Sequence, residues 1–222
     1  KSVVTDHKKN EEKTTTTYSY DSAGNRTKKV KGEEETAYTY NGLNQLLKAK
    51  TTKGNTVKND ISYEYDVNGN QIKETDKETG DSVENTYDVE NRLSTATVTK
   101  KKESTSGNET VSLTQENLYN GEGQRIQKKE AGEVTNYFYE DGMVSYTTGA
   151  DTGEKRIQNL SGLEDNVIYA EQKVTGKDGT ASAYQDFLYT KDIQGSTSSI
   201  LNKDTKGELS YEYDDFGETS IH

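Results

Sequence analysis

The stretch YSYDSAGNRT, residues Tyr18 to Thr27, joins an alternating run to a run of turn-forming residues. Tyr18 and Tyr20 are separated by a single serine, so both rings would lie on one face of a β-strand. The Asp-x-x-Gly-Asn sequence that follows is typical of a turn, because Asp and Asn bond their own backbone and Gly and Asn tolerate positive φ. The stretch therefore predicts a strand that ends in a tight turn.

The same phrase recurs along the chain. Copies are YTYNGLNQL from Tyr38, YEYDVNGNQI from Tyr63, NTYDVENRL from Asn85 and NLYNGEGQRI from Asn117, with looser copies from Tyr137, Phe187 and Tyr211. The last aromatic residues of successive copies are 20, 25, 22, 32, 20, 50 and 24 residues apart. A recurring period in the low twenties indicates an array of structural repeats, in which the longer gaps are insertions or a degenerate copy.

Each repeat contains a second extended run and a second turn. RLSTATVT from Arg92 is an example of the run, and Lys53-Gly54-Asn55 and Thr79-Gly80-Asp81 are examples of the turn. The sequence has no sustained apolar spacing at helical intervals. About eight units of two strands predict roughly 16 antiparallel strands, too many for a flat open sheet. We expect an all-β fold, an antiparallel meander in a curved sheet, with residues 1–222 as a single array and a degenerate or inserted region at about 142–184.

Composition narrows the classes of function. Only 27% of the 222 residues are hydrophobic and 30% are charged, with a mean hydropathy of −1.12, but most of the 16 tyrosines lie inside the repeated phrase. The formal charge of −11 argues against a nucleic-acid partner, because such binding depends on clustered Lys and Arg. The absence of cysteine excludes disulfides and thiol catalysis. No apolar run is long enough to insert in a membrane.

The candidate site residues are those that repeat. They are Tyr18, Tyr20, Asp21, Gly24, Asn25, Arg26, Tyr38, Tyr40, Asn44, Tyr63, Tyr65, Asp66, Gly69, Asn70, Tyr87, Asp88, Asn91, Arg92, Tyr119, Gly123, Arg125, Tyr137, Tyr139, Tyr189, Gly195, Tyr211, Tyr213, Asp214, Phe216 and Gly217. We interpret them as a structural motif. The sequence predicts no catalytic residue, metal site or cofactor.

Alternatives to that interpretation exist for each residue type. The repeated Asp and Asn residues could line a catalytic or metal site, but turn chemistry gives them backbone amides to bond. DVNGNQ from Asp66 superficially suggests a calcium loop, yet Gln71 and Lys77 occupy the positions that would require Gly and Glu. Arg26, Arg92 and Arg125 could bind an anionic ligand, or instead bond turn carbonyls and acids and stack on tyrosine.

The tyrosines and the remaining acids leave two further alternatives open. The aromatic rings could form a platform for sugars, although rings that recur in every unit are also what packing between repeats requires. The two histidines, His7 and His222, lie near the ends of the chain and do not suggest a triad. A pair of glycosidase carboxylates is conceivable among 39 acids, but no particular pair stands out.

The phrases YDSAGNR, YDVNGNQI, YDVENRL and YNGEGQRI resemble the tyrosine-aspartate repeat of the Rhs family of polymorphic toxins, toxin-complex proteins, wall-associated proteins and teneurins. DIQGSTSSILNKDTKGELSYEYDDFGE, residues Asp192 to Glu218, resembles the end of an Rhs core. The resemblance extends from Thr17 to Glu218 and is weakest between Gly142 and Tyr184.

The resemblance implies a β-ribbon that forms part of a shell, or cocoon. Its partners would be neighbouring YD repeats and a C-terminal toxin or other payload of the same secreted or surface-attached bacterial polypeptide. The family's Asp-Pro cleavage motif is absent, since the chain has no proline. We therefore expect a non-enzymatic piece of wall excised from a longer protein. The alternative is a cell-surface adhesin or carbohydrate-binding array with surface glycans as partners.

Overall fold

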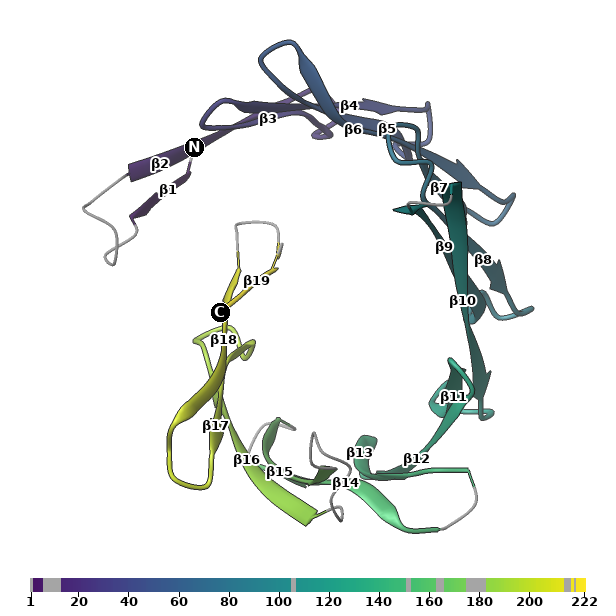
Figure 1. Ribbon diagram of the computed structural model, residues 1–222, viewed down its shortest axis with the longest axis vertical. Coiled ribbons are helices and arrows are strands. Elements are labelled where there is room, and N and C mark those ends of the chain that lie inside the picture. Colours follow the sequence, from purple (N-terminus) through teal and green to yellow (C-terminus); the bar gives the residue numbers. More distant parts are fainter. Residues whose placement is uncertain are drawn as a thin grey trace. The chain divides into compact units, whose positions relative to one another are not determined.

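A computed structural model describes residues 2–5, 13–104, 107–150, 153–162, 166–174, 183–213, 217 and 219–222. This part of the chain is all-β, with strands β1 to β19 and no helix. The chain divides into two compact units, Lys1–Glu116 and Asn117–His222. Within each unit every strand pairs antiparallel with the next strand along the chain, so the expected all-β antiparallel meander is confirmed (Figure 1).

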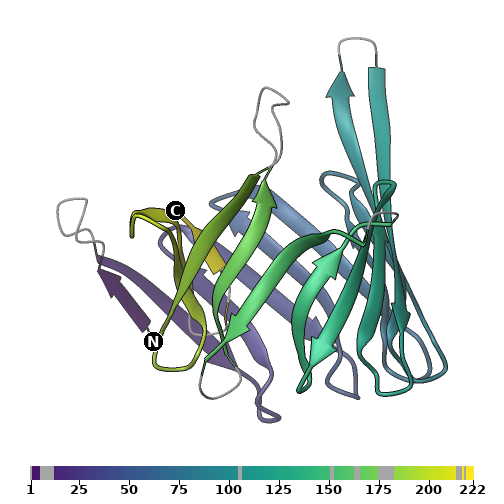
Figure 2. The same ribbon diagram turned by 90° about the horizontal axis from the view of Figure 1, so that it is seen from below.

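The first unit holds β1 to β9 and most of β10. Their bounds are β1 Ser2–Thr5, β2 Lys13–Tyr20, β3 Arg26–Lys31, β4 Glu34–Tyr40, β5 Leu46–Lys53, β6 Thr56–Tyr65, β7 Gln71–Asp76, β8 Ser82–Tyr87, β9 Leu93–Ser104 and β10 Gly107–Tyr119. The two longest of the described strands, β9 and β10, pair from Glu116 with Thr95 to Gly107 with Ser104 and form a hairpin that extends past its neighbours (Figure 2).

The second unit holds the remaining strands. Their bounds are β11 Arg125–Glu130, β12 Glu133–Glu140, β13 Met143–Thr148, β14 Lys155–Ser161, β15 Val167–Val174, β16 Ala183–Lys191, β17 Thr197–Asn202, β18 Gly207–Tyr213 and β19 Thr219–Ile221.

The described part of the region 142–184 contains ordinary strands. β13, β14 and β15 lie in it, and β16 begins at Ala183. The repeat phrase is therefore not required for strands to pair here, because backbone hydrogen bonds supply the pairing. Another side-chain donor can also take the place of the tyrosine hydroxyl. Asn159 on β14 donates its Nδ2 to the Val144 carbonyl at 2.8 Å, a contact like those the tyrosines make elsewhere. These strands help to explain why the structure describes 19 strands where the repeat count predicted roughly 16.

The two faces of the first unit differ in composition. Tyr38, Ala49 and Ile61 are directly opposite one another on β4, β5 and β6, which places them on one face, the tyrosine face. On the other face a row of hydroxyl side chains crosses five strands through the pairs Ser62 with Thr75, Thr75 with Ser82, Ser82 with Thr99 and Thr99 with Ser112. This hydroxyl face is strongly polar.

Burial in the described residues is shallow. The buried hydrophobic residues are Ala49 and Ala170, at 8% and 1% exposure, and no large side chain is fully buried. In the described part of each unit neither face packs against a second layer, so no conventional core forms there. Stability must come from strand pairing and from half-buried side chains that touch their neighbours along the sheet.

Candidate functional site

Several of the turns that follow tyrosine strands are closed by their own first residue. Asp66 Oδ1 accepts the backbone amides of Asn68 and Asn70 at 2.9 Å each, and Asp66 Oδ2 accepts Asn70 Nδ2 at 2.9 Å. The Gly69 amide donates to the Asp66 carbonyl at 3.1 Å, with Gly69 at φ 90°. The turn beginning at Asp21 repeats this set of bonds through Ala23 and Asn25.

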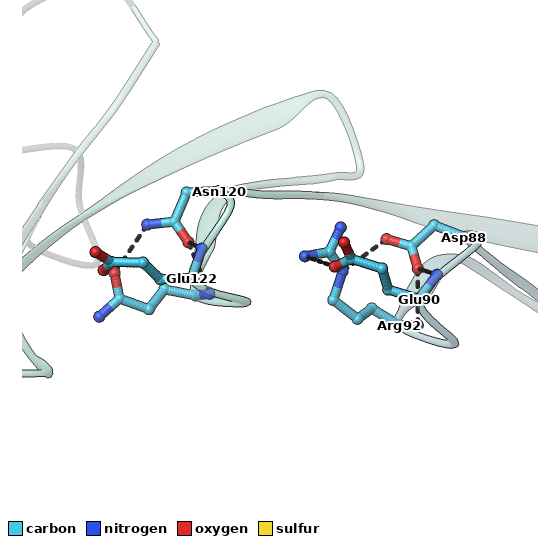
Figure 3. A network of polar contacts seen from close by, with 6 residues as sticks. Asp88, Glu90, Arg92, Asn120 and Glu122 are labelled. Atoms are coloured by element: carbon cyan, nitrogen blue, oxygen red, sulfur yellow. Dashed lines mark hydrogen bonds and ion pairs between the residues drawn. The ribbon is translucent and has the colours of Figure 1, made fainter.

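In five of these turns the first residue is matched to the fifth. Aspartates pair with hydrogen-bond donors, Asp21 with Asn25, Asp66 with Asn70 and Asp88 with Arg92 Nε at 2.7 Å. Asparagines pair with glutamine, whose Oε1 accepts the asparagine Nδ2, in Asn41 with Gln45 at 2.6 Å and Asn120 with Gln124 at 2.8 Å. Figure 3 shows one turn of each kind from close by, with Asp88, Glu90 and Arg92 in one and Asn120 and Glu122 in the other. The chemistry of each turn is thus complete within five residues.

In five repeats the last tyrosine of the phrase connects its strand to the previous repeat. Its hydroxyl donates to the carbonyl of a residue at or just before the start of a strand: Tyr40 to Arg26 at 2.9 Å, Tyr65 to Leu46 at 2.9 Å, Tyr87 to Gln71 at 3.0 Å, Tyr139 to Arg125 at 3.0 Å and Tyr213 to Thr197 at 2.7 Å. In the first unit Tyr20, Tyr40, Tyr65 and Tyr87 each lie at a shift in strand register.

Adjacent turns are also joined side chain to side chain. Asn25 Nδ2 donates to Asn44 Oδ1 at 2.8 Å, and Asn68 and Asn70 both donate to Asn91 Oδ1, at 3.1 and 2.9 Å. Asn44 and Asn91 occupy the positive-φ position of their turns, both at φ 61°. An asparagine there can adopt the left-handed conformation and still contact the neighbouring turn, which glycine cannot do.

The three arginines that follow the turns contact residues of the array. Arg26 lies over the rings of Tyr18 and Tyr38, at 5.8 and 4.6 Å, and Arg125 lies 4.9 Å from the ring of Tyr137. Arg92 instead forms ion pairs with Asp88 and Glu90. These contacts hold the three guanidinium groups against side chains of the array.

The turn bonds shift the pKa values of the groups that make them. The Asn25 and Asn70 side chains lower the pKa of Asp21 and of Asp66, and the backbone amide of Arg92 lowers the pKa of Asp88. Burial raises the pKa of Tyr63 to about 12. None of these groups is thereby made a base or a nucleophile near neutral pH.

The other expected residues take similar places. Gly24, Gly123, Gly195 and Gly217 all have positive φ. Tyr119, Tyr137, Tyr189 and Tyr211 lie on β10, β12, β16 and β18. Asp214 and Phe216 lie outside the described residues. The carbonyl acceptors and Asn159 were missed, although the spacing of 14 residues from Tyr40 back to Arg26 and from Tyr139 back to Arg125 was visible in the sequence.

Two kinds of feature are absent from the part of the chain that the structure describes. No group of three or more His, Cys, Asp or Glu residues there could hold a metal ion. No helix there is long and apolar enough to cross a membrane.

The fold and this site define a β-sheet of repeats, in which turn side chains and tyrosine hydroxyls link each repeat to its neighbour.

No protein-family model matches the chain. It is 29% identical over 213 residues to the tRNA3(Ser)-specific nuclease WapA of Bacillus spizizenii and 28% identical over 215 residues to the tRNA nuclease WapA of Bacillus subtilis. Each match covers 93% of this chain and 8% of the relative. The chain therefore spans about 8% of the length of these curated relatives.

A solved structure shares the fold. The crystal structure of TcdB2-TccC3-Cdc42 aligns with 95% of this chain, and this chain with 16% of its length, at a TM-score of 0.52 and 13% identity. The similarity in sequence to these WapA proteins and the shared fold confirm the resemblance to proteins of the Rhs type.

Proposed function

We propose that this chain is a length of wall in a β-shell that encloses a toxin payload belonging to the same polypeptide. The observation that carries the proposal is the way the repeats hold together: the connections described above run along the sheet, and both faces of the described strands stay at least partly open to solvent. A single-layered β-sheet wall is held together by contacts between neighbouring strands and does not require a hydrophobic core of its own. The likeness to Rhs-type toxin proteins supports the same reading.

The payload that fits best is a nuclease-type toxin domain outside this segment. The relatives are named as tRNA nucleases, and this chain matches only 8% of their length. An acidic segment with a charge of −11 is poorly suited to hold RNA itself. The segment is on this proposal non-enzymatic, and the polypeptide acts outside the cell that makes it or at that cell's surface.

The test is to open the wall and ask whether a payload becomes accessible. A cleavage sequence for a site-specific protease is inserted between Gly54 and Asn55, in the exposed turn between β5 and β6 of the native polypeptide. Before cutting, we expect the payload to resist a broad protease and the protein to cleave RNA poorly. After cutting, digestion and RNA cleavage should both rise about tenfold or more. Equal digestion before and after the cut would contradict enclosure.

One observation supports a second candidate, carbohydrate binding. Phe138 and Tyr146 stack at 4.4 Å between centroids, with Phe138 40% exposed and Lys155 Nζ 4.6 Å from the Tyr146 ring. An aromatic stack beside a cation suits the binding of a sugar ring. Titration of glycan fragments against the native polypeptide, with Phe138→Ser as the variant, would support this candidate only if binding is saturable and is lost in the variant.

A further inference from the structure

Four apolar side chains form a row across the second unit. Leu160 on β14 is directly opposite Tyr169 on β15, Tyr169 is opposite Leu188 on β16, and Leu188 is opposite Leu201 on β17. Residues that are directly opposite in antiparallel strands point to the same face. At about 4.8 Å between strands, this apolar row is roughly 14 Å long.

The apolar row faces away from Tyr189, the repeat-phrase tyrosine of β16. Tyr189 neighbours Leu188 on β16 and therefore points to the opposite face, where it is opposite Ile200, and Ile200 is opposite Leu209. Leu160 is 59% exposed and Leu188 38% exposed, so the apolar row is accessible along much of its length. Apolar surface that recurs on adjacent strands and stays open to water is a mark of an interaction site.

The neighbouring rows define the chemistry of a partner. On one side lie Glu171 and Asp186, which are opposite each other. Asp186 accepts the Tyr169 hydroxyl at 2.6 Å, which fixes that ring beside the carboxylate. Among the described residues, no lysine or arginine forms an ion pair with Glu171 or Asp186. On the other side lie the hydroxyls of Thr190, Ser199 and Ser210.

The first unit shows that apolar residues are not required at such positions. Its hydroxyl face carries the row from Ser62 through Thr75, Ser82 and Thr99 to Ser112, with Glu64, Lys73 and Glu84 in the next row. Strand pairing is equally regular there. The apolar row of the second unit therefore needs a reason other than holding the sheet together.

We propose that the apolar row binds one segment of the payload, a segment that carries apolar side chains next to lysine or arginine. The apolar side chains would cover Leu160 and Leu188, and the cations would pair with Glu171 and Asp186. The chain's net charge of −11 favours a cationic occupant over an anionic one. This inference rests on the proposed function and adds to it the place of contact and the character of the bound segment.

The test uses a photo-crosslinking amino acid in the native polypeptide. Benzoylphenylalanine replaces Leu188, and after irradiation the crosslinked peptides are identified by mass spectrometry. The matched control places the same residue at Ile193, a turn position in the same unit that is 104% exposed. We expect crosslinks from position 188 to one payload segment with apolar residues and Lys or Arg, and few or none from position 193.

A pair of substitutions supplies a second measurement. Leu160→Asn combined with Leu188→Asn should speed hydrogen exchange of the crosslinked payload segment about tenfold, while the circular dichroism of the wall stays unchanged. Crosslinks only to a second copy, only to other repeats, or equally from both positions would overturn the inference. Protection of the payload from protease, with none of these crosslinks, would leave the proposed function standing and reject the apolar row as its contact.

Discussion

At the scale of single residues, the tyrosine hydroxyl is the group that distinguishes this sheet from an ordinary meander. A phenylalanine would bury nearly the same ring but could not bond the carbonyl of the preceding repeat. A neutral hydrogen bond of this kind contributes about 0.5–1.5 kcal/mol to the free energy of unfolding. Repeated along the array, the contribution is large for a chain that buries so little apolar surface.

The first prediction compares two tyrosines. Tyr65→Phe removes the side-chain donor to the Leu46 carbonyl and should cost about 1 kcal/mol of unfolding free energy. Tyr87→Phe should cost less, because the Gln71 carbonyl also accepts Asn85 Nδ2 at 3.0 Å. Tyr20→Phe, at a ring that is 52% exposed, is the control. Urea unfolding measures all three, and equal costs at the three positions would contradict the assigned role of the hydroxyl.

The second prediction concerns two adjacent threonines in β13. Thr147 is 5% exposed, and its Oγ1 has no hydrogen-bond partner among the described residues. Thr147→Val should therefore stabilise the protein by about 1 kcal/mol, since it removes an unsatisfied buried hydroxyl and keeps the shape. Thr148→Val is the matched control and should destabilise, because Thr148 Oγ1 donates to the Gly149 carbonyl at 3.1 Å and accepts Asn136 Nδ2 at 3.3 Å. Thermal unfolding of both variants measures whether each substitution raises or lowers the stability of the protein.

At the scale of the element, the first and fifth positions form a matched pair in the turns that begin at Asp21, Asn41, Asp66, Asp88 and Asn120. Asp66→Asn would bring two amide Nδ2 groups together at Asn70 and should lower the unfolding midpoint. Asp66→Asn combined with Asn70→Gln recreates the pair found at Asn41 with Gln45 and should recover most of the loss. A double-mutant cycle measures the coupling. Additive effects would show that the two positions do not act as a pair.

The same turn predicts a dependence of stability on pH. The folded-state pKa of Asp66 is lowered below its ordinary value of 3.8 by Asn70, so the ionised carboxylate stabilises the folded state. That contribution is present in full above the ordinary pKa and is lost as the pH falls through the lowered folded-state value. The unfolding midpoint of the native chain should thus fall below about pH 4. The Asp66→Asn, Asn70→Gln variant should fall less steeply, and identical slopes would contradict this assignment.

At the scale of the whole molecule, each compact unit is a linear array in which each described strand pairs with the next. Deletion of Asp66–Tyr87 removes one complete repeat and joins Tyr65 to Asp88, which restores a tyrosine followed by an aspartate turn. We expect the shortened chain to keep its β-sheet circular dichroism and to unfold cooperatively. Deletion of residues 77–87 is the control, because it removes a single strand and reverses the direction of those that follow. Equal loss of structure in both deletions would argue against a modular array.

The local elements of this protein were determined by the sequence. Alternating tyrosines specify a strand with both rings on one face, and the residues from Asp66 to Asn70 contain every partner that their turn needs. These hydrogen bonds form within five residues. The pairing of Asp with Asn or Arg, and of Asn with Gln, at the first and fifth turn positions can therefore be read from the sequence. The repeat period and the antiparallel meander follow from these units.

Other features were decided only by the tertiary structure. The carbonyl that each tyrosine hydroxyl bonds depends on strand register and on the shift at the end of each strand, which are set by pairing between distant segments. The strands of residues 142–184 form without the phrase, because their neighbours supply the backbone partners. The apolar row of Leu160, Tyr169, Leu188 and Leu201 is scattered over 42 residues of sequence and becomes a single surface only when four strands align.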